Sequence, residues 1–273
     1  MNWGKAKNIS ILVFLMLNIG LMTLIHIDNR RFVLASDNQA AIVQVLADNG
    51  VYLSDNFSFV RHSPLRRMNL AENNLSNRAL VSLFMRNNTG LYVENTPYGD
   101  IFSTNVERVS FYNGSVKYEN IYLDISFLNE TEMRSFSNSI IRGLGDSGRY
   151  FSFDNIKTHD DTTILSYRQI YRNNIIYSNY IIFTFVNNNL QTIHFNLNPV
   201  TGFFGENRSL RSSDEILLTF MRKLDREPGQ TITIDSMDIV YRATDLIASP
   251  YYRIIFNCNQ TMLINAYTGL MGR

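Results

Sequence analysis

One short segment of this chain has residue types suited to nucleophilic catalysis. In Gly145-Asp146-Ser147-Gly148 a serine stands between small and acidic neighbours. A serine nucleophile needs a base within hydrogen-bond reach and a carboxylate that orients the base. The upstream candidate is His62, but the residues around it do not resemble those beside a catalytic histidine. The tetrapeptide directly follows an expected helix end at Gly143, so a polar turn explains it and we expect no catalytic residue.

The sequence contains even fewer residues that could bind a metal or a cofactor. The chain has four histidines and one cysteine, Cys258, which we expect to be a small buried hydrophobe. His159-Asp160-Asp161 clusters potential ligands, but sequential neighbours seldom converge on one ion, so we expect a solvated turn. His194 belongs on the polar face of an alternating strand. Because the phosphate-loop, dinucleotide and zinc-protease motifs are missing from the sequence as well, we expect no metal site, no cofactor and no enzymatic activity.

Composition limits the remaining functions. The chain has 273 residues, of which 45% are hydrophobic and 18% charged, so it is long enough to bury a core. Its net charge of +1 gives no basic field for nucleic acid, and we expect none as a partner. A single cysteine excludes a disulfide framework.

The apolar run near the start of the chain indicates that the protein is located at a membrane. Residues 9–27 contain no charged side chain, and about nineteen helical residues would span roughly 28 Å, close to a bilayer's hydrocarbon thickness. Lys5 and Lys7 precede the run, and Trp3 stands where an interfacial anchor belongs. We therefore expect a cytoplasmic head at 1–8, a transmembrane helix at 9–27, a linker at 28–35, and the bulk of the chain outside the cytoplasm.

Two other interpretations of this segment fit its residues less well. A cleaved signal peptide would use Val33-Leu34-Ala35, but the apolar run exceeds the usual length and 28–31 adds charge before that site. A buried core helix would show a polar face, which this segment lacks. An exported domain almost without cysteine is typical of a Gram-positive surface protein.

The expected span carries one polar side chain near its centre, Asn18. An amide in hydrocarbon costs free energy unless it finds a partner, typically on another helix. Phe14 and Met22 share its helical face. The sequence therefore offers Phe14, Asn18 and Met22 as residues that bind a partner helix, with a single tolerated polar residue in a plain anchor as the alternative.

Beyond the span, four segments begin with helix-capping residues and continue with apolar residues three or four apart. The expected starts are Ser36 with Gln39, Ser76, Asn129 with Glu132, and Ser212 with Glu215. The expected apolar positions are Ile42, Val45 and Leu46, then Leu80, Leu83 and Phe84, then Met133, Phe136 and Ile140, then Leu217, Phe220 and Leu224.

Between these helices the apolar period changes to two. Residues 192–197 alternate cleanly, and turns are expected at Asn113-Gly114, 172–174, 187–189 and 259–260. Short turns require antiparallel pairing, so we predict an α+β fold in which helices cover antiparallel sheets. A composition shift near 124–130 places a boundary between an ectodomain module at 36–126 and a second at 127–273.

Motifs at both ends of the chain carry a resemblance to a known family. The chain opens with Asn2-Trp3-Gly4-Lys5-Ala6-Lys7-Asn8-Ile9 and continues with Phe14-Leu15-Met16-Leu17-Asn18. These two stretches resemble the head and apolar helix of the YycI (WalI) family. Pro250-Tyr251-Tyr252-Arg253-Ile254 and Asn265-Ala266-Tyr267-Thr268-Gly269 resemble its closing strand and hairpin, which PepSY-type domains share. Tyr252 departs from the tryptophan frequent in the family, and the middle of the chain shows no comparable motif.

The resemblance implies YycH/PepSY-like ectodomain modules and a role in cell-wall homeostasis. It implies a regulator that contacts the YycG (WalK) sensor histidine kinase through membrane helices, together with a YycH-like protein. In this chain the resemblance assigns the partner contact only to the apolar helix 9–27, with Asn18 as the central residue. The alternatives are a PepSY-like inhibitor of an extracytoplasmic protease, a binder of envelope polymer through exposed tyrosines, and a hydrolase using Ser147.

Overall fold

The structure, a computed structural model, describes two compact units. The described residues are 3–73, 75–85, 89–112, 114–122, 125–225, 227, 229–257 and 260–272, without the side chains of residues 5, 6, 9 and 25–31. What we name the terminal unit consists of Met1–Leu65, Arg208–Asp238 and Tyr252–Arg273. The central unit consists of Arg66–Asn207 and Ile239–Tyr251.

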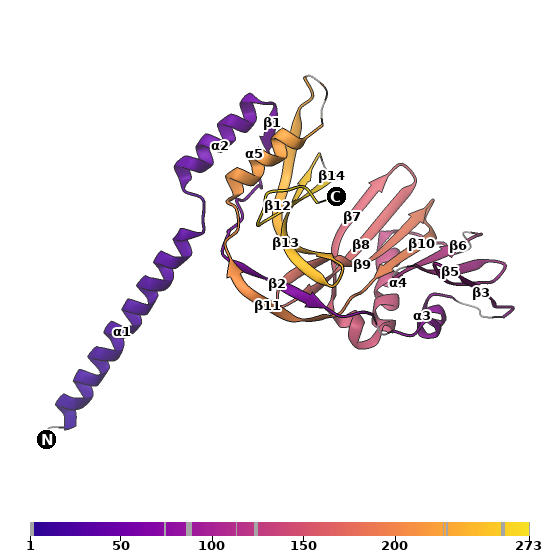
Figure 1. Cartoon of the computed structure of the whole chain (residues 1–273), viewed down its shortest axis with the longest axis horizontal. Helices are drawn as coiled ribbons and strands as arrows, with labels where there is room; N and C mark the ends of the chain where they lie inside the picture. The colour runs from indigo at the N-terminus through magenta and orange to yellow at the C-terminus, as the bar shows by residue number, and fades with distance from the viewer. Residues whose placement is uncertain are drawn as a thin grey trace. The chain divides into compact units, whose positions relative to one another are not determined.

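The terminal unit packs helices on short strand pairs. Its helices are α1 (Trp3–Arg31), α2 (Ser36–Asp48) and α5 (Ser213–Lys223) (Figure 1). Its strands are β1 (Val51–Leu53), β14 (Gln260–Asn265) and parts of β12 (Ile232–Thr244) and β13 (Ile247–Phe256), which also contribute to the central unit. β1 pairs parallel with β12, with Val51 opposite Ile232. Phe220 of α5 packs against Phe256 of β13, with ring centroids 5.1 Å apart.

Helix α1 contains the whole of the predicted span, and the apolar side chains that the structure describes along it are exposed. Within the part of the chain that the structure describes, no helix combines the length and the apolar character needed to cross a bilayer. Of the expected span 9–27, the side chains of residues 9 and 25–27 lie outside that part.

The central unit contains an antiparallel run of strands in the order β7-β8-β9-β10-β6-β5-β4-β3. These strands are β3 (Tyr92–Thr96), β4 (Gly99–Ser103), β5 (Glu107–Tyr112), β6 (Ser115–Asn120), β7 (Phe151–His159), β8 (Thr162–Tyr171), β9 (Asn174–Val186) and β10 (Asn189–Asn196). Strands β2 (Leu65–Leu70) and β11 (Val200–Arg208) also lie in this unit, apart from one terminal residue each. β12 joins β9 in parallel, with Val240 opposite Ile175.

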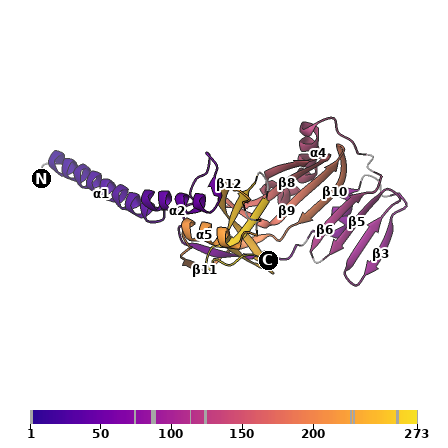
Figure 2. The same ribbon diagram turned by 90° about the horizontal axis from the view of Figure 1, so that it is seen from above.

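Helices α3 (Asn77–Phe84) and α4 (Glu130–Gly143) cover the core of the central unit, and η1 (Gly145–Tyr150) follows α4. Helix α4 lies beside strands β8 to β10 (Figure 2), where Phe136 meets Phe183 with centroids 6.4 Å apart. Ile193 and Phe195 of β10 are buried, so the apolar face of the alternating segment 192–197 lies in the core. The predicted α+β class is confirmed.

Three of the four predicted helix starts have the expected position. Ser76 Oγ accepts from Ala79 N at 3.2 Å, and Asn129 Oδ1 accepts from Glu132 N at 3.1 Å. Ser212 is the N-cap of α5, although its hydroxyl contacts Asp214 rather than a backbone amide.

The capping box predicted at Ser36 is wrong. Ser36 is already helical, and Ala35 is the N-cap of α2, without a side-chain cap. Gln39 Nε2 instead donates to Leu34 O at 2.7 Å, so this side chain bonds to the backbone of the residue that precedes the N-cap Ala35.

The predicted hairpins connect the expected strands. Asn187 and Asn188 join β9 to β10 with φ of 49° and 63°, and Arg172 and Asn173 join β8 to β9 with φ of 45° and 66°. Asparagine tolerates this left-handed conformation better than most residues. Asn113 and Asn259, at two other predicted turns, lie outside the described residues, although β5 and β6 pair as expected.

The two compact units are not consecutive stretches of the chain, and the module boundary expected at 126/127 stays a prediction. Residues 126 and 127 both belong to the central unit, and Ser126 forms an isolated bridge with Asn189. The terminal unit instead combines the start of the chain with two later segments. Composition along the chain does not reveal such a division, because pairing between distant segments creates it.

Candidate functional site

The residues predicted to bind a partner helix lie on one face of α1. Phe14 and Met22 expose 70% and 74% of their surface, and Asn18, one turn from each, is also exposed. Other large apolar residues of the helix are exposed as well, including Leu12 and Met16 on the opposite face. The helix therefore offers an apolar surface that other described parts of the chain leave uncovered.

The Asn18 side chain has a partner within its own helix. Asn18 Nδ2 donates to Phe14 O at 2.8 Å, and Thr23 Oγ1 donates to Ile19 O at 2.8 Å. Bonds of this kind to the carbonyl four residues earlier lower the cost of placing a polar side chain among apolar ones. A partner on another helix is therefore not required to satisfy this N–H, although the amide stays on the exposed face.

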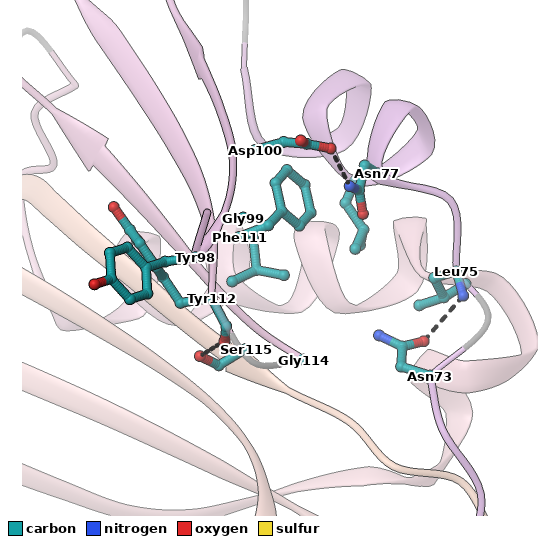
Figure 3. Close-up of a pocket in the computed structure, with 12 residues that line it drawn as sticks. Asn73, Leu75, Asn77, Tyr98, Gly99, Asp100, Phe111, Tyr112, Gly114 and Ser115 are labelled. Carbon is teal, nitrogen blue, oxygen red and sulfur yellow. Dashed lines mark hydrogen bonds between the residues drawn. The ribbon is translucent and has the colours of Figure 1, made fainter. Parts of the chain in front are cut away.

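The central unit contains a cavity of about 270 Å³ between α3 and the strands β4 to β6 (Figure 3). Leu80, Phe111 and Val116 supply apolar lining, and Tyr98 and Tyr112 are exposed aromatic residues of the lining. Polar side chains come from Asn73, Asn77, Asp100 and Ser115.

Hydrogen bonds hold the polar residues of this cavity in place. Asn77 Nδ2 donates to Asp100 Oδ2 at 3.1 Å, which links the first turn of α3 to β4. Asn73 Oδ1 accepts from Leu75 N at 3.0 Å and shapes the loop before α3. The cavity thus has polar side chains on one side and two tyrosines on the other (Figure 3), and its lining can both hydrogen-bond a hydroxylated ligand and pack against an apolar face.

Backbone geometry at Gly99 shapes the same cavity. Its φ of 144° is rarely adopted by residues with a side chain, and a Cβ there would lie 1.8 Å from Phe111 O. Gly99 thus lets β4 approach β5 closely after the Pro97-Tyr98 turn, which leaves the Tyr98 ring exposed. Exposed tyrosines were predicted only as a class, without Tyr98 or Tyr112 among named site residues. The Pro-Tyr-Gly turn between alternating segments was the available signal.

The structure places Ser147 and His62 in different units. Ser147 lies in the central unit, in η1, the short turn that follows α4 where a polar turn was predicted. His62 lies in the terminal unit. Ser147 lines a second cavity of about 240 Å³, and the described residues of that lining include no histidine. Burial lowers the pKa of His62, against the opposing effects of Asp214 and Glu215.

The other histidines have structural surroundings. His159 Nδ1 contacts Asp160 Oδ2 at 2.9 Å with both side chains almost fully exposed, and Asp160 and Asp161 form the β7–β8 turn. The predicted solvated turn is confirmed. His194 is half-buried opposite Lys117, and burial lowers its pKa, with Lys117 adding to the effect and Glu119 opposing it. Cys258 lies outside the described residues.

The C-terminal residues that carry the family resemblance stabilise the terminal unit. Arg253 pairs with Asp238 through two bonds, Nε to Oδ1 at 2.9 Å and the terminal nitrogen to Oδ2 at 2.6 Å. Tyr252 OH donates to Arg211 O at 2.7 Å, and burial raises the pKa of this phenol. Asn265 Oδ1 accepts from the backbone of Tyr267 and Thr268, which closes the last turn. These contacts hold the fold together.

No family model and no curated protein matches this chain. Among solved structures, an uncharacterised protein from Eubacterium rectale superposes with a TM-score of 0.50 at 11% identity, over 82% of this chain and 91% of that one. YycH from Bacillus subtilis gives 0.47 at 12% identity, over 76% and 56%. The C-terminal domain of Bacillus megaterium YpeB gives 0.39 at 8% identity, over 75% and 97%. What the chain shares with the first of these proteins is its fold.

Proposed function

We propose that this chain is a membrane-anchored extracytoplasmic regulator of a cell-wall two-component system. In this proposal, α1 occupies the membrane with its N-terminus in the cytoplasm and contacts the helices of a YycG/WalK-like sensor histidine kinase and of a YycH-like protein. No catalytic residue, metal or cofactor takes part. The sequence resemblance at both ends of the chain suggests this system.

One observation carries the proposal, namely the exposure of the apolar side chains of α1. Leu12, Phe14 and Met22 each expose more than half of their surface. Exposed apolar surface of this extent is typical of a helix that lies against lipid or a partner. Residues on one face of such a helix can bias a kinase between two states with a coupling of only about 1–3 kcal/mol.

The first test is a pull-down of the full chain from native membranes in mild detergent, read by mass spectrometry. We expect a sensor kinase to be recovered with the native chain and lost when residues 9–27 are replaced by an unrelated apolar sequence. The substitutions Phe14→Ala and Met22→Ala should weaken recovery. Leu12→Ala and Met16→Ala, on the opposite face, are the matched controls. Kinase recovery with the replaced helix would move the contact to the rest of the chain, and no kinase with either chain would contradict the proposal.

The cavity of Figure 3 favours a second candidate function, binding of an envelope polymer. Tyr98 and Tyr112 line the same cavity as Asn77 and Asp100, on its other side, and sugars are bound by aromatic faces combined with amide and carboxylate groups. Tyr98→Ala should then reduce retention of the full chain on purified wall material. Tyr122→Ala removes an equally exposed tyrosine outside the cavity and should not. Equal retention of both variants would exclude this cavity as the binding site.

A further inference from the structure

The second cavity of the central unit contains a preorganised hydrogen-bond donor. Gln169 of β8 lines this cavity and is only 6% exposed. Its carboxamide oxygen accepts from Asn179 Nδ2 at 2.6 Å. Among the described residues, nothing accepts a hydrogen bond from Gln169 Nε2.

The neighbouring asparagine determines which end of the Gln169 amide is free. The backbone N–H of Asn198 can only donate, and it donates to Asn179 Oδ1 at 3.0 Å. Asn179 must therefore present its NH₂ group to Asn198 O, at 2.8 Å, and to Gln169. Gln169 in turn must accept with Oε1, so the network leaves Nε2 as an unpaired donor. Asn179 is fully buried, which fixes this arrangement.

The rest of the cavity is neutral and mostly apolar. Leu197 and Val200 supply aliphatic lining, and Tyr150 and Tyr171 supply aromatic lining. Ser147 adds a hydroxyl that has no hydrogen-bond partner among the described residues. The single charged residue of the described lining, Asp146, is turned to solvent and pairs with Arg149 at 3.2 Å. The described lining contains no cationic side chain, so an anionic ligand finds no counter-charge among these residues.

The volume of the cavity limits the size of the ligand. At about 240 Å³ it holds roughly eight water-sized groups, which corresponds to one amino-acid residue. Gln169 Nε2 belongs to the lining and has no acceptor among the described residues, so a ligand that supplies an acceptor can form a hydrogen bond there. A monosaccharide, with hydroxyls around its whole ring, would bury most of them against Leu197 and Val200 without partners.

We propose that this cavity binds one aliphatic residue of a partner polypeptide. The aliphatic side chain packs among Leu197, Val200 and Tyr171, and a main-chain carbonyl oxygen accepts from Gln169 Nε2. The hydroxyl of Ser147 then serves as a neutral polar contact at the cavity wall rather than as a nucleophile. This site is independent of the contact proposed for α1, so either proposal can fail without the other.

The test is titration of the full chain, held in mild detergent, with N-acetyl-leucine methylamide, observed by saturation-transfer NMR and calorimetry. We expect binding to the native chain and its loss in Val200→Trp, which fills the cavity without touching the amide network. Gln169→Met should weaken binding about tenfold, because it keeps the length of the side chain and removes the donor. Thermal unfolding checks that both variants fold.

Controls separate this cavity from other sites and other ligands. Tyr98→Ala alters the cavity of Figure 3 and Asn18→Leu alters α1, and both should bind the probe as the native chain does. Free leucine, which carries a carboxylate and an ammonium group, and N-acetylglucosamine should bind more weakly than the probe. The proposal is overturned if the probe does not bind the native chain, if Val200→Trp binds it equally well, or if either of those two ligands binds more tightly.

Discussion

The backbone N–H of His62 donates to the carbonyl oxygen of Phe32 at 3.0 Å, and the two rings meet edge to face with centroids 6.2 Å apart. Two residues earlier, Val60 O accepts from Ser213 Oγ at 2.8 Å. The short segment 60–62 therefore joins the chain just beyond α1 to the start of α5. It is the physical connection between the proposed partner-binding helix and the folded part of the terminal unit.

Removal of the Phe32 ring should weaken this connection. Phe32 is half-buried, so we expect Phe32→Ala to lower the free energy of unfolding by about 1–2 kcal/mol, less than for a core phenylalanine. Urea unfolding of the full chain in detergent measures the change. Phe14→Ala removes the same ring from an exposed position of α1 and should cost less than about 0.5 kcal/mol. Similar losses for both variants would show that the ring contact contributes nothing.

Acidification should destabilise the protein through His194 and His62. Burial lowers the pKa of both imidazoles below the usual value of 6.5, so the folded state favours the neutral form. The unfolded chain then binds protons more tightly, and stability that is present above pH 6.5 is lost as the pH falls through the folded-state pKa. The urea midpoint should fall between pH 7 and pH 5.

Substitution of single histidines assigns this pH dependence. His194→Asn should flatten the decrease in the urea midpoint, and His62→Asn should flatten it further. A slope that is identical in the native chain and in the His194 and His62 variants would disprove the assignment.

Asn129 at the start of α4 and Ser36 at the start of α2 should contribute differently to stability. Asn129 caps α4, and its replacement by alanine leaves the amide of Glu132 without this acceptor. We expect a loss of about 1 kcal/mol. Ser36→Ala should change stability by less than about 0.5 kcal/mol, because Ser36 is inside α2 and does not cap it. Thermal unfolding of both variants decides the point, and an equal loss would mean that Ser36 acts as a cap after all.

Gly99 should tolerate no side chain. Gly99→Ala places a methyl group against Phe111 O, so β4 must move away from β5, and we expect a loss of at least about 3 kcal/mol. Gly90 also has a positive φ, of 74°, but its Cβ would meet nothing within 4 Å. Gly90→Ala should therefore cost only about 1 kcal/mol. Comparable stability of the two variants in urea would contradict the close approach at Gly99.

Local patterns were enough to predict the helices and hairpins of this fold. Ser76 and Asn129 cap helices because a capping side chain bonds to a backbone amide only three residues away. The Asn187-Asn188 turn likewise depends on the conformational preferences of its own residues. The exposed face at Phe14, Asn18 and Met22 follows from helical spacing, which a sequence also contains.

Long-range pairing could not be predicted in the same way. Nothing near Val51 indicates that it pairs in parallel with Ile232, and nothing near Ile175 indicates Val240. Gln169 is a donor in a cavity only because Asn179 donates to its carboxamide oxygen, and Asn179 is itself oriented by the backbone of Asn198. Tyr98 and Asp100 face the same cavity as Asn77 because β4 lies against α3. Such sites exist only after the strands have paired.

The terminal unit is assembled from segments that are far apart in the chain, which also determines when it can fold. Ser54 Oγ donates to Asp235 O across 181 residues of sequence, and Tyr267 OH donates to Leu65 O across 202. A ribosome makes α1, α2 and β1 before it makes segments 208–238 and 252–273, which complete the unit and include the strand partner of β1. Until those segments emerge, this unit is an open set of segments, and contacts of such long range form slowly. Residues 1–65 are therefore made early and acquire their structure late.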